Sequence, residues 1–373
     1  MDAKAIDIVD IMNQIAPSAL AEEKDNVGLQ CGYPDQTVEK VRVALDPTMQ
    51  VVNEACQDHI DILITHHPLI FKPLRTVDFS RGVGSIIQQA AMNNMSLFSA
   101  HTNLDSVEGG INDILAGRIG LKDTAVLGMP YSNDVYKLAV FVPVEYSQKI
   151  LDVLFKADAG RFGNYSCCSF SSEGIGTFMP EVGAKPFSGR INEVNQEKET
   201  KIEALVLKKN ISATVKLLKE NHPYETMAYD VYPVVSEMGR QGLGRVGILD
   251  EEVSLDVFAE GIREKMKLAT VKIAGRSDLT VKKVAVCSGS GSSLMNEFLF
   301  SGAQVYVSGD LKYHDARIAE ESERGLIDIG HFGSEHIIVE ALAERIREEL
   351  GKRSFNVKVD TCRSEKDPFT VII

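Results

Sequence analysis

Residues 41–68, VRVALDPTMQVVNEACQDHIDILITHHP, contain the pattern that decides the fold. Residues 41–45 alternate between apolar and other side chains as a strand does, and a helix is predicted from about residue 48 to residue 58. The apolar run 62–64 then predicts a buried strand. A strand, a helix and a second strand within this length form a βαβ unit, so the two strands are expected to pair in parallel through a right-handed crossover.

The C-terminal third of the chain repeats this alternation. We predict three strands and three helices there, in the order strand 284–286, helix 292–300, strand 304–307, helix 313–323, strand 326–329 and helix 334–350. Both ends of the chain therefore predict an α/β domain with largely parallel sheets.

The middle of the chain has a different order of elements. A strand at 136–142, a helix at 145–157 and a Cys/Ser-rich strand are followed by strand 201–207, helix 211–220 and strand 228–233. This βαββαβ order is typical of ferredoxin-like α+β domains. The segment follows a predicted turn at 130–133 and precedes a Gly-rich stretch. We therefore expect residues 1–129 and 239–373 to form one discontinuous α/β domain, into which residues 130–238 are inserted.

The composition is that of a globular protein. Of the 373 residues, 44% are hydrophobic and 25% are charged, which is too apolar for intrinsic disorder. The net charge of −13 makes nucleic-acid binding an unfavoured prediction, because a phosphate backbone is bound through clusters of Lys and Arg. We expect no membrane span, since no apolar run reaches roughly 18 residues. An acidic N-terminal segment and six cysteines without a CxxC pair predict a reduced, cytoplasmic protein.

The strongest chemical signal is Thr65-His66-His67-Pro68, directly after the apolar strand 62–64. Ligands of open α/β sheets bind at the carboxyl ends of the strands, where these histidines are expected. Adjacent side chains on extended backbone point in opposite directions, so two metal ions suit this pair better than one. A lone histidine is more often structural, but two at the end of a buried strand favour metal ligands.

A second candidate segment, residues 99–105, again follows an apolar strand and ends in Asp105. Asp105 offers a hard oxygen ligand. His101 could be a ligand, an acid or base, or a residue that orients a ligand. The structural alternative is a turn in which Asp105 caps a helix.

The third candidate is His331-Phe332-Gly333-Ser334-Glu335, at the junction of a strand and the last helix. His331 and Glu335 are four residues apart, so they face one point if the helix begins near Phe332. Alone, Glu335 would be explained as a partner of the helix dipole. We expect the three strand ends to lie in one sheet, and the five nitrogen and oxygen ligands that they bear predict a two-metal site rather than a mononuclear one.

Weaker motifs leave alternatives open. Residues 242–247 match the dinucleotide pattern G-x-G-x-x-G but lack the strand-to-helix context, so we interpret them as an interdomain loop. Residues 288–293 connect a strand to a helix and predict either an anion-binding loop or a tight structural turn. His314 is expected at the same sheet edge as Asp310, beside the ligands or the substrate. His222, in the insert, is favoured as structural.

Together, the motifs at residues 25–29, 65–68, 101–105, 308–310 and 330–335 resemble the Nif-three-like family, also called the dinuclear metal-centre hexameric family and the type-two homologues of GTP cyclohydrolase I. The resemblance covers about residues 1–127 and 240–373, and the insert resembles a PII/CutA-like domain. It implies a homohexamer, a dimer of trimers, with two divalent metal ions per subunit. The implied ligands are His66, His67, Asp105, His331 and Glu335, with Glu335 bridging.

Two functions from different classes follow as expectations. The first is a metal-dependent hydrolase, of cyclohydrolase or phosphoesterase type, in which a metal-bound hydroxide attacks a small nucleotide-like or anionic substrate and His101 or His314 is the catalytic proton donor. The second is a regulatory or interaction protein that senses a metal or ligand. Zinc is our first choice of metal, and manganese, iron or cobalt also suit such ligands.

Overall fold

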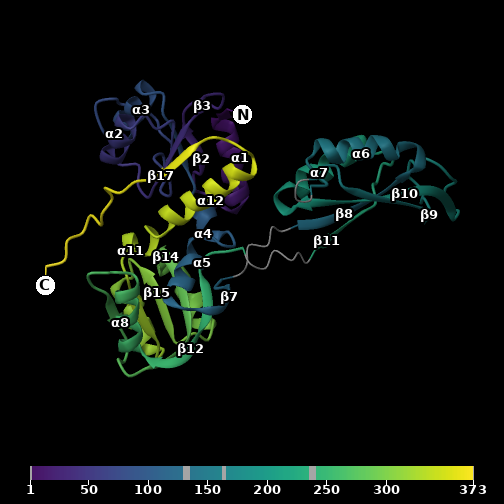
Figure 1. Cartoon of the computed structure of the whole chain (residues 1–373). Helices are drawn as coiled ribbons and strands as arrows, with labels where there is room; N and C mark the ends of the chain where they lie inside the picture. Colours follow the sequence, from purple (N-terminus) through teal and green to yellow (C-terminus); the bar gives the residue numbers. More distant parts are fainter. Residues whose placement is uncertain (1, 129–134, 162–164, 235–240, 373) are drawn as a thin grey trace. The chain divides into compact units, whose positions relative to one another are not determined.

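The computed structural model describes residues 2–128, 135–161, 165–234 and 241–372. Contacts divide the chain into two compact units, residues 1–130 with 240–373, and residues 131–239 (Figure 1). The expected turn at 130–133 and both expected domain boundaries lie outside the described residues. Among the helices of the described ranges, none has the length and apolarity needed to cross a bilayer.

The first unit contains a five-stranded sheet with the order β17(Lys358–Thr361), β4(Lys40–Ala44), β5(Ile62–Thr65), β6(Ser96–Ser99) and β2(Gly28–Cys31). The first four strands are parallel, and β2 runs antiparallel to β6. Successive side chains of β4 and β5 alternate between two apolar cores. α1(Ala5–Ile15) and α12(Ile338–Lys352) cover one face, and α2(Met49–Gln57) and α3(Gly82–Met92) cover the other. The predicted βαβ unit is thus present.

The second sheet of this unit corrects the expectation of largely parallel sheets. Its six strands are β13(Lys272–Ala274), β16(Gly325–Asp328), β15(Val305–Gly309), β14(Thr280–Ser290), β12(Arg245–Ser254) and β7(Lys122–Val126), in that order. β14, β15 and β16 are parallel, and the other three pairings are antiparallel. One of these three pairings follows from the insertion, because β7 and β12 flank it and pair as the two arms of a hairpin.

Helices cover both faces of the six-stranded sheet. α5(Ile111–Ile119) and α8(Leu255–Lys265) pack on one side, and α9(Met295–Phe300) and α10(Tyr313–Glu321) on the other. The smaller elements are the two-strand ladder of β1(Ala3–Lys4) and β3(Thr37–Val38) and the short helices α4(Thr102–Ser106) and α11(His331–Glu335).

The ends of the insertion meet at the β7–β12 pair. Val126 of β7 is the register partner of Arg245 of β12, and the Leu127 amide donates to the Gly244 carbonyl at 3.3 Å. Arg245 is 2% exposed and forms two hydrogen bonds to Asp113, at 2.7 and 2.8 Å. Residues 242–247, which match the dinucleotide pattern, therefore include the start of β12, and Arg245 in this motif forms a buried ion pair.

The second unit has the element order β8(Val135–Pro143), α6(Ser147–Lys156), β9(Ser169–Phe178), β10(Asn195–Leu207), α7(Lys208–Asn221) and β11(Tyr229–Pro233). Its sheet has the order β11-β8-β10-β9, and every neighbouring pair is antiparallel. A core of its own joins the strands to both helices. This is the βαββαβ order predicted from the sequence.

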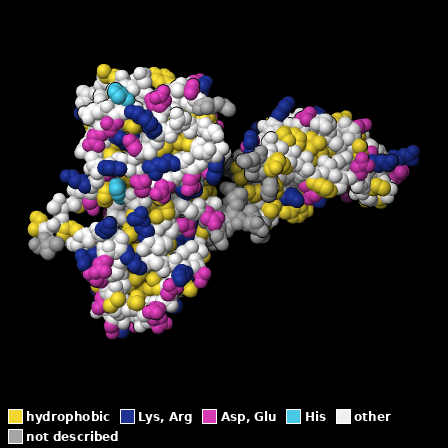
Figure 2. All heavy atoms as spheres, in the orientation of Figure 1, with side chains coloured by type: hydrophobic (Ala, Val, Ile, Leu, Met, Phe, Trp, Pro, Cys, Tyr) yellow, Lys and Arg dark blue, Asp and Glu magenta, His cyan; other side chains and the backbone are white. Residues whose placement is uncertain are grey.

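The molecular surface carries both signs of charge. On the face shown in Figure 2, Lys and Arg side chains are interspersed with Asp and Glu side chains. Such a mixture is typical of a solvated surface and provides no continuous basic track on that face.

Candidate metal centre

The candidate site lies where strands of both sheets of the first unit end. His66 and His67 follow β5, His101 follows β6, and Asp105 lies on α4, the helix after β6. His331 and Glu335 are the first and last residues of α11, which follows β16. α11 ends at Glu335 and α12 begins at Ile338, so the single helix predicted at 334–350 is two helices. The earlier start places His331 and Glu335 on one helical turn.

The Glu335 carboxylate lies at the centre of the histidines. Its Oε2 atom is 2.9 Å from Nε2 of His67 and 3.0 Å from Nε2 of His331. Its Oε1 atom is 3.7 Å from Nε2 of His66, whose Nε2 is also 3.6 Å from Oδ1 of Asp105. The two carboxylate oxygens therefore face different histidines, the arrangement that a carboxylate needs in order to bridge two ions.

All four histidines are held by their Nδ1 atoms. Nδ1 of His66 donates to the Ala100 carbonyl at 2.9 Å. The Nδ1 atoms of the other three histidines donate to aspartate carboxylates. The acceptors are Asp46 for His67 (2.7 Å), Asp25 for His101 (2.9 Å) and Asp310 for His331 (2.8 Å). Each bond orients its ring, so that Nε2 can offer its lone pair to a metal ion once it carries no proton.

Three buried ligand atoms at the centre have no hydrogen-bond partner: Nε2 of His66, Oδ1 of Asp105 and Oε2 of Glu335. The close contacts of Glu335 Oε2 with His67 and His331 lack hydrogen-bond geometry. Buried polar atoms are nearly always paired. Cations bound at this centre would supply the partners that these atoms lack, so the residues present fit a metal site.

The pKa values of the histidines and carboxylates at the centre also agree with a metal site. Burial alone would lower the pKa of His67, but Asp46 and Glu335 raise it to about 10. Glu335, opposed by burial, raises the pKa of His331 to about 9. Burial raises the pKa of Asp105 to about 6, whereas the histidines hold the pKa of Glu335 well below its ordinary value against burial. Protons on the histidines balance the carboxylates in the metal-free protein, and metal ions would replace them.

Among the described residues, two groups bring their ligand atoms within 4.8 Å of one another. One consists of His66, His67 and His101, and the other of His67, His331 and Glu335. His67 belongs to both. The structure thus places His101, expected as a catalytic residue, among the histidines that could hold an ion.

A family model described as Duf34/NIF3 (NGG1p interacting factor 3) matches residues 3–368. The chain belongs to the DUF34/NIF3 family. The resemblance drawn from the motifs is confirmed.

Relatives of this NIF3-family chain cover its whole length. A Bacillus subtilis (strain 168) protein named GTP cyclohydrolase 1 type 2 homolog is 37% identical over 365 residues, 98% of both chains. Two solved structures are also similar. A Bacillus cereus protein related to NIF3 has a TM-score of 0.72 at 35% identity and 100% coverage of both chains. Staphylococcus aureus protein SA1388 has a TM-score of 0.77 at 31% identity, covering 100% of this chain and 99% of that one.

Neither group of possible ligands among the described residues of the NIF3-family chain includes His314 or His222. His314 is an exposed residue of α10 whose ring contacts the Tyr313 ring, with centroids 5.5 Å apart. In the insert, Nε2 of His222 lies 2.9 Å from the Phe141 carbonyl and its Nδ1 accepts from the Tyr224 amide, which agrees with a structural role.

The loop at 288–293 packs tightly behind Glu335. The Gly289 amide donates to Oγ of Ser334, and the Ser288 amide donates to the Asn112 side chain, both at 2.8 Å. A Cβ atom on Gly289 would lie 2.1 Å from Oε1 of Glu335. Ser288 and Gly289 belong to β14, so the strand predicted at 284–286 continues to Ser290. Their amide contacts with other parts of the chain agree with the structural alternative for this segment rather than with anion binding.

Sequence reasoning gave no role to Asp25 or Asp46, the carboxylates that hold His101 and His67. Asp46 is the second residue after β4, at the same sheet edge as His66, His67 and His101, so the strand-end argument could have found it. Asp25 follows no strand, and only the folded chain brings it to His101.

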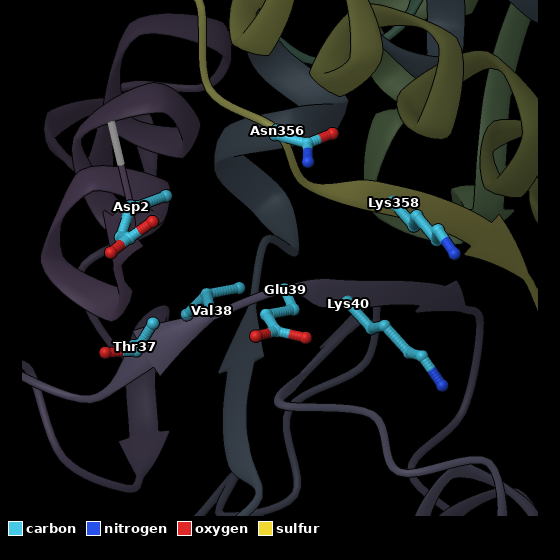
Figure 3. Close-up of a pocket in the computed structure, with 8 residues that line it drawn as sticks. Asp2, Thr37, Val38, Glu39, Lys40, Asn356 and Lys358 are labelled. Carbon is cyan, nitrogen blue, oxygen red and sulfur yellow. The ribbon is translucent and has the colours of Figure 1, made fainter.

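A separate groove of about 310 Å³ lies away from this centre (Figure 3). Lys40 and Lys358, the first residues of β4 and β17, line it together with Asp2 and Glu39. It is therefore at the amino ends of these strands, whereas the metal ligands follow the carboxyl ends. Nζ of Lys40 donates to the Asp58 carbonyl at 2.8 Å, so this cation already has a partner.

Proposed function

We propose that this NIF3-family chain holds two divalent metal ions, zinc in our first choice, and is a hydrolase of a small anionic, nucleotide-like substrate. The observation that carries the proposal is the convergence of three Nε2 atoms, those of His66, His67 and His331, on two buried carboxylates. The Nδ1 atom of each of these histidines is fixed by a hydrogen bond. The name GTP cyclohydrolase 1 type 2 homolog, given to the Bacillus subtilis relative, supports the reaction class.

Some residues of the chain would hold the metal ions, and others would position a proton donor. Bound ions supply Lewis-acid chemistry, polarising a substrate bond and lowering the pKa of water. His66, His67, Asp105, His331 and Glu335 would hold the ions, with Glu335 between them. Asp25 remains ionised despite burial, since hydrogen bonds from His101 and Thr102 keep its pKa well below the ordinary value. This carboxylate orients His101 and stabilises positive charge on it, as a proton donor requires.

The proposal extends to the insert and the assembly. In chain order the insert's sheet places the fourth strand first, then the first, third and second, which supports a ferredoxin-like, PII/CutA-like module. We further propose a homohexamer, a dimer of trimers, in the cytoplasm, where six unpaired cysteines remain reduced. A separate insert with its own core also favours the alternative, a regulatory protein that senses a metal or ligand.

Metal analysis combined with turnover tests the function. Protein purified without chelator should contain two ions per chain, and Glu335→Ala should lose metal. Hydrolysis of GTP or a phosphoester should disappear on chelation and return with added metal. One ion or fewer per chain would contradict the dinuclear site, and two ions without hydrolysis of any nucleotide, amide or phosphoester would favour the regulatory alternative.

His101 needs its own experiment, because it is both a predicted acid and a possible ligand. We expect His101→Asn to keep both ions and to lower kcat by roughly 10²–10⁴-fold, the usual share of general acid–base catalysis. His59→Asn provides a matched control at an exposed position, and His314→Asn tests the other predicted proton donor by the same measurements. Loss of an ion from the His101 variant would make this residue a ligand instead.

A further inference from the structure

A half-exposed aromatic ring lies beside the metal centre. Phe71 is 52% exposed, and its ring meets the His101 ring edge-on, with centroids 6.2 Å apart and an interplanar angle of 85°. His101 in turn lies 5.2 Å from the His66 ring and 5.7 Å from the His67 ring. Phe71 therefore borders the cluster of histidines while keeping half of its surface open.

The backbone next to Phe71 is clamped by side chains. The Ile70 amide donates to Oε1 of Gln30 at 3.1 Å, and Nδ2 of Asn26 donates to the Ile70 carbonyl at 2.6 Å. Gln30 also donates to the Asn26 carbonyl at 2.8 Å, which ties the two clamping residues together. Both polar groups of Ile70 are thus satisfied, and the attachment point of the Phe71 ring is fixed.

The same short segment holds His101. The Asn26 amide donates to Oδ1 of Asp25 at 2.8 Å, and the same oxygen accepts from Nδ1 of His101 at 2.9 Å. Residues 25–30 therefore fix the spacing between the histidine and the aromatic ring. Fixing a large apolar side chain partly in water gains little hydrophobic stabilisation, which points to a use in binding.

We propose that Phe71 is the stacking surface of the substrate site, and that the substrate is an anion bearing a planar unsaturated ring. This inference rests on the proposed function, in which the metal ions bind the anionic group. A ring that stacks on Phe71 would then lie next to His101 and the ions. Stacking on a fixed aromatic side chain accepts any flat ring, so Phe71 selects a chemical class rather than one molecule.

Two phosphonates test the inference because they share an anionic group and are not hydrolysed. Phenylphosphonate and methylphosphonate would be titrated calorimetrically into the metal-loaded full chain. We expect phenylphosphonate to bind about 10-fold more tightly, within the range of single stacking contacts. Phe71→Leu should reduce this ratio to about 2 or less, because leucine is apolar but cannot stack. Phe71→Tyr should retain it.

Phe79→Leu is the matched control, since Phe79 lies in the same loop and is 53% exposed. It should leave the ratio unchanged. Equal binding of both phosphonates by the wild-type chain, or equal effects of the two leucine variants, would overturn this inference alone. A changed oligomeric mass of Phe71→Leu would overturn it by placing Phe71 in a subunit contact. Binding of neither phosphonate to the metal-loaded protein would refute the proposed anion site and this inference with it.

Discussion

At the scale of single residues, the centre depends on side chains that touch no ion. Asp25, Asp46 and Asp310 each accept from the Nδ1 atom of one histidine. A carboxylate in this position fixes the ring and makes the other nitrogen a stronger ligand. Metal affinity should therefore respond to these acids as well as to the ligands.

Asp46→Asn should weaken metal binding about 10–100-fold, the usual effect of losing such a partner. The amide can still accept from His67 but carries no charge. Competition with a chromophoric chelator measures the affinity. Asp35→Asn, at an acid whose side chain is 91% exposed, is the control. An Asp46 variant with the affinity of the control would show that the 2.7 Å contact has no influence on the metal.

The histidine pKa values predict that metal uptake releases protons. His67 and His331, with pKa values of about 10 and about 9, are protonated in the metal-free chain at pH 7.5, and metal binding must displace about two protons from them. Calorimetry in buffers of different ionisation enthalpy counts these protons. His314→Gln should give the same number, and release of none would contradict the assigned protonation.

The same pKa values determine how metal-free stability depends on pH. Both folded-state values are raised above the unfolded value of about 6.5. Their contribution to the free energy of unfolding is thus complete below pH 6.5 and disappears as the pH rises through about 9 to 10. The Tm of metal-free protein should fall across this range, and the metal-loaded protein should change less.

At the scale of elements, strand ends were the most informative signal. His66, His67, His101 and His331 follow apolar strands or runs in the sequence, where ligands are expected. The parallel strands β5 and β6 end at one edge of the five-stranded sheet, but β16 belongs to the six-stranded sheet, so the meeting of the two sheets at the site was not predictable from strand ends. The Nδ1 partners were harder to predict, because Asp25 and His101 are 76 residues apart and meet only through tertiary structure. The break between α11 and α12 was also missed, since apolar periodicity continues across it.

Glu365, in the segment after β17, was not predicted either. Its side chain is 4% exposed and accepts from the amides of Leu45 and Asp46 at 2.9 and 2.8 Å. Glu365→Ala would leave these two amides without their acceptor, at a cost of about 1–3 kcal/mol each. Urea unfolding of the metal-free protein measures the loss, with Glu344→Ala on the exposed face of α12 as control. Equal stability of the two variants would refute this role.

At the scale of the whole molecule, the inserted unit should be removable. Val126 and Arg245 are register partners and the Leu127 amide donates to Gly244, so a two-residue Asn-Gly turn can replace residues 128–243. The shortened chain should fold and keep its metal ions, as circular dichroism and metal analysis would show. The Asn-Gly turn fits the β7–β12 hairpin. If the shortened chain nevertheless unfolds or loses metal, the metal centre depends on the inserted unit.

The chain leaves the first unit after β7 and returns to it at β12, and these two strands are paired. This pairing has a mechanical consequence. Tension applied through the insert would act on the ends of both strands at one point, so the β7–β12 hydrogen bonds would break in succession, as in unzipping, rather than together in shear. β7 is the edge strand, and β12, β14 and β15 separate it from β16, the strand that leads to His331. In an optical trap, a weak peeling of β7 should therefore precede any rupture that releases the metal.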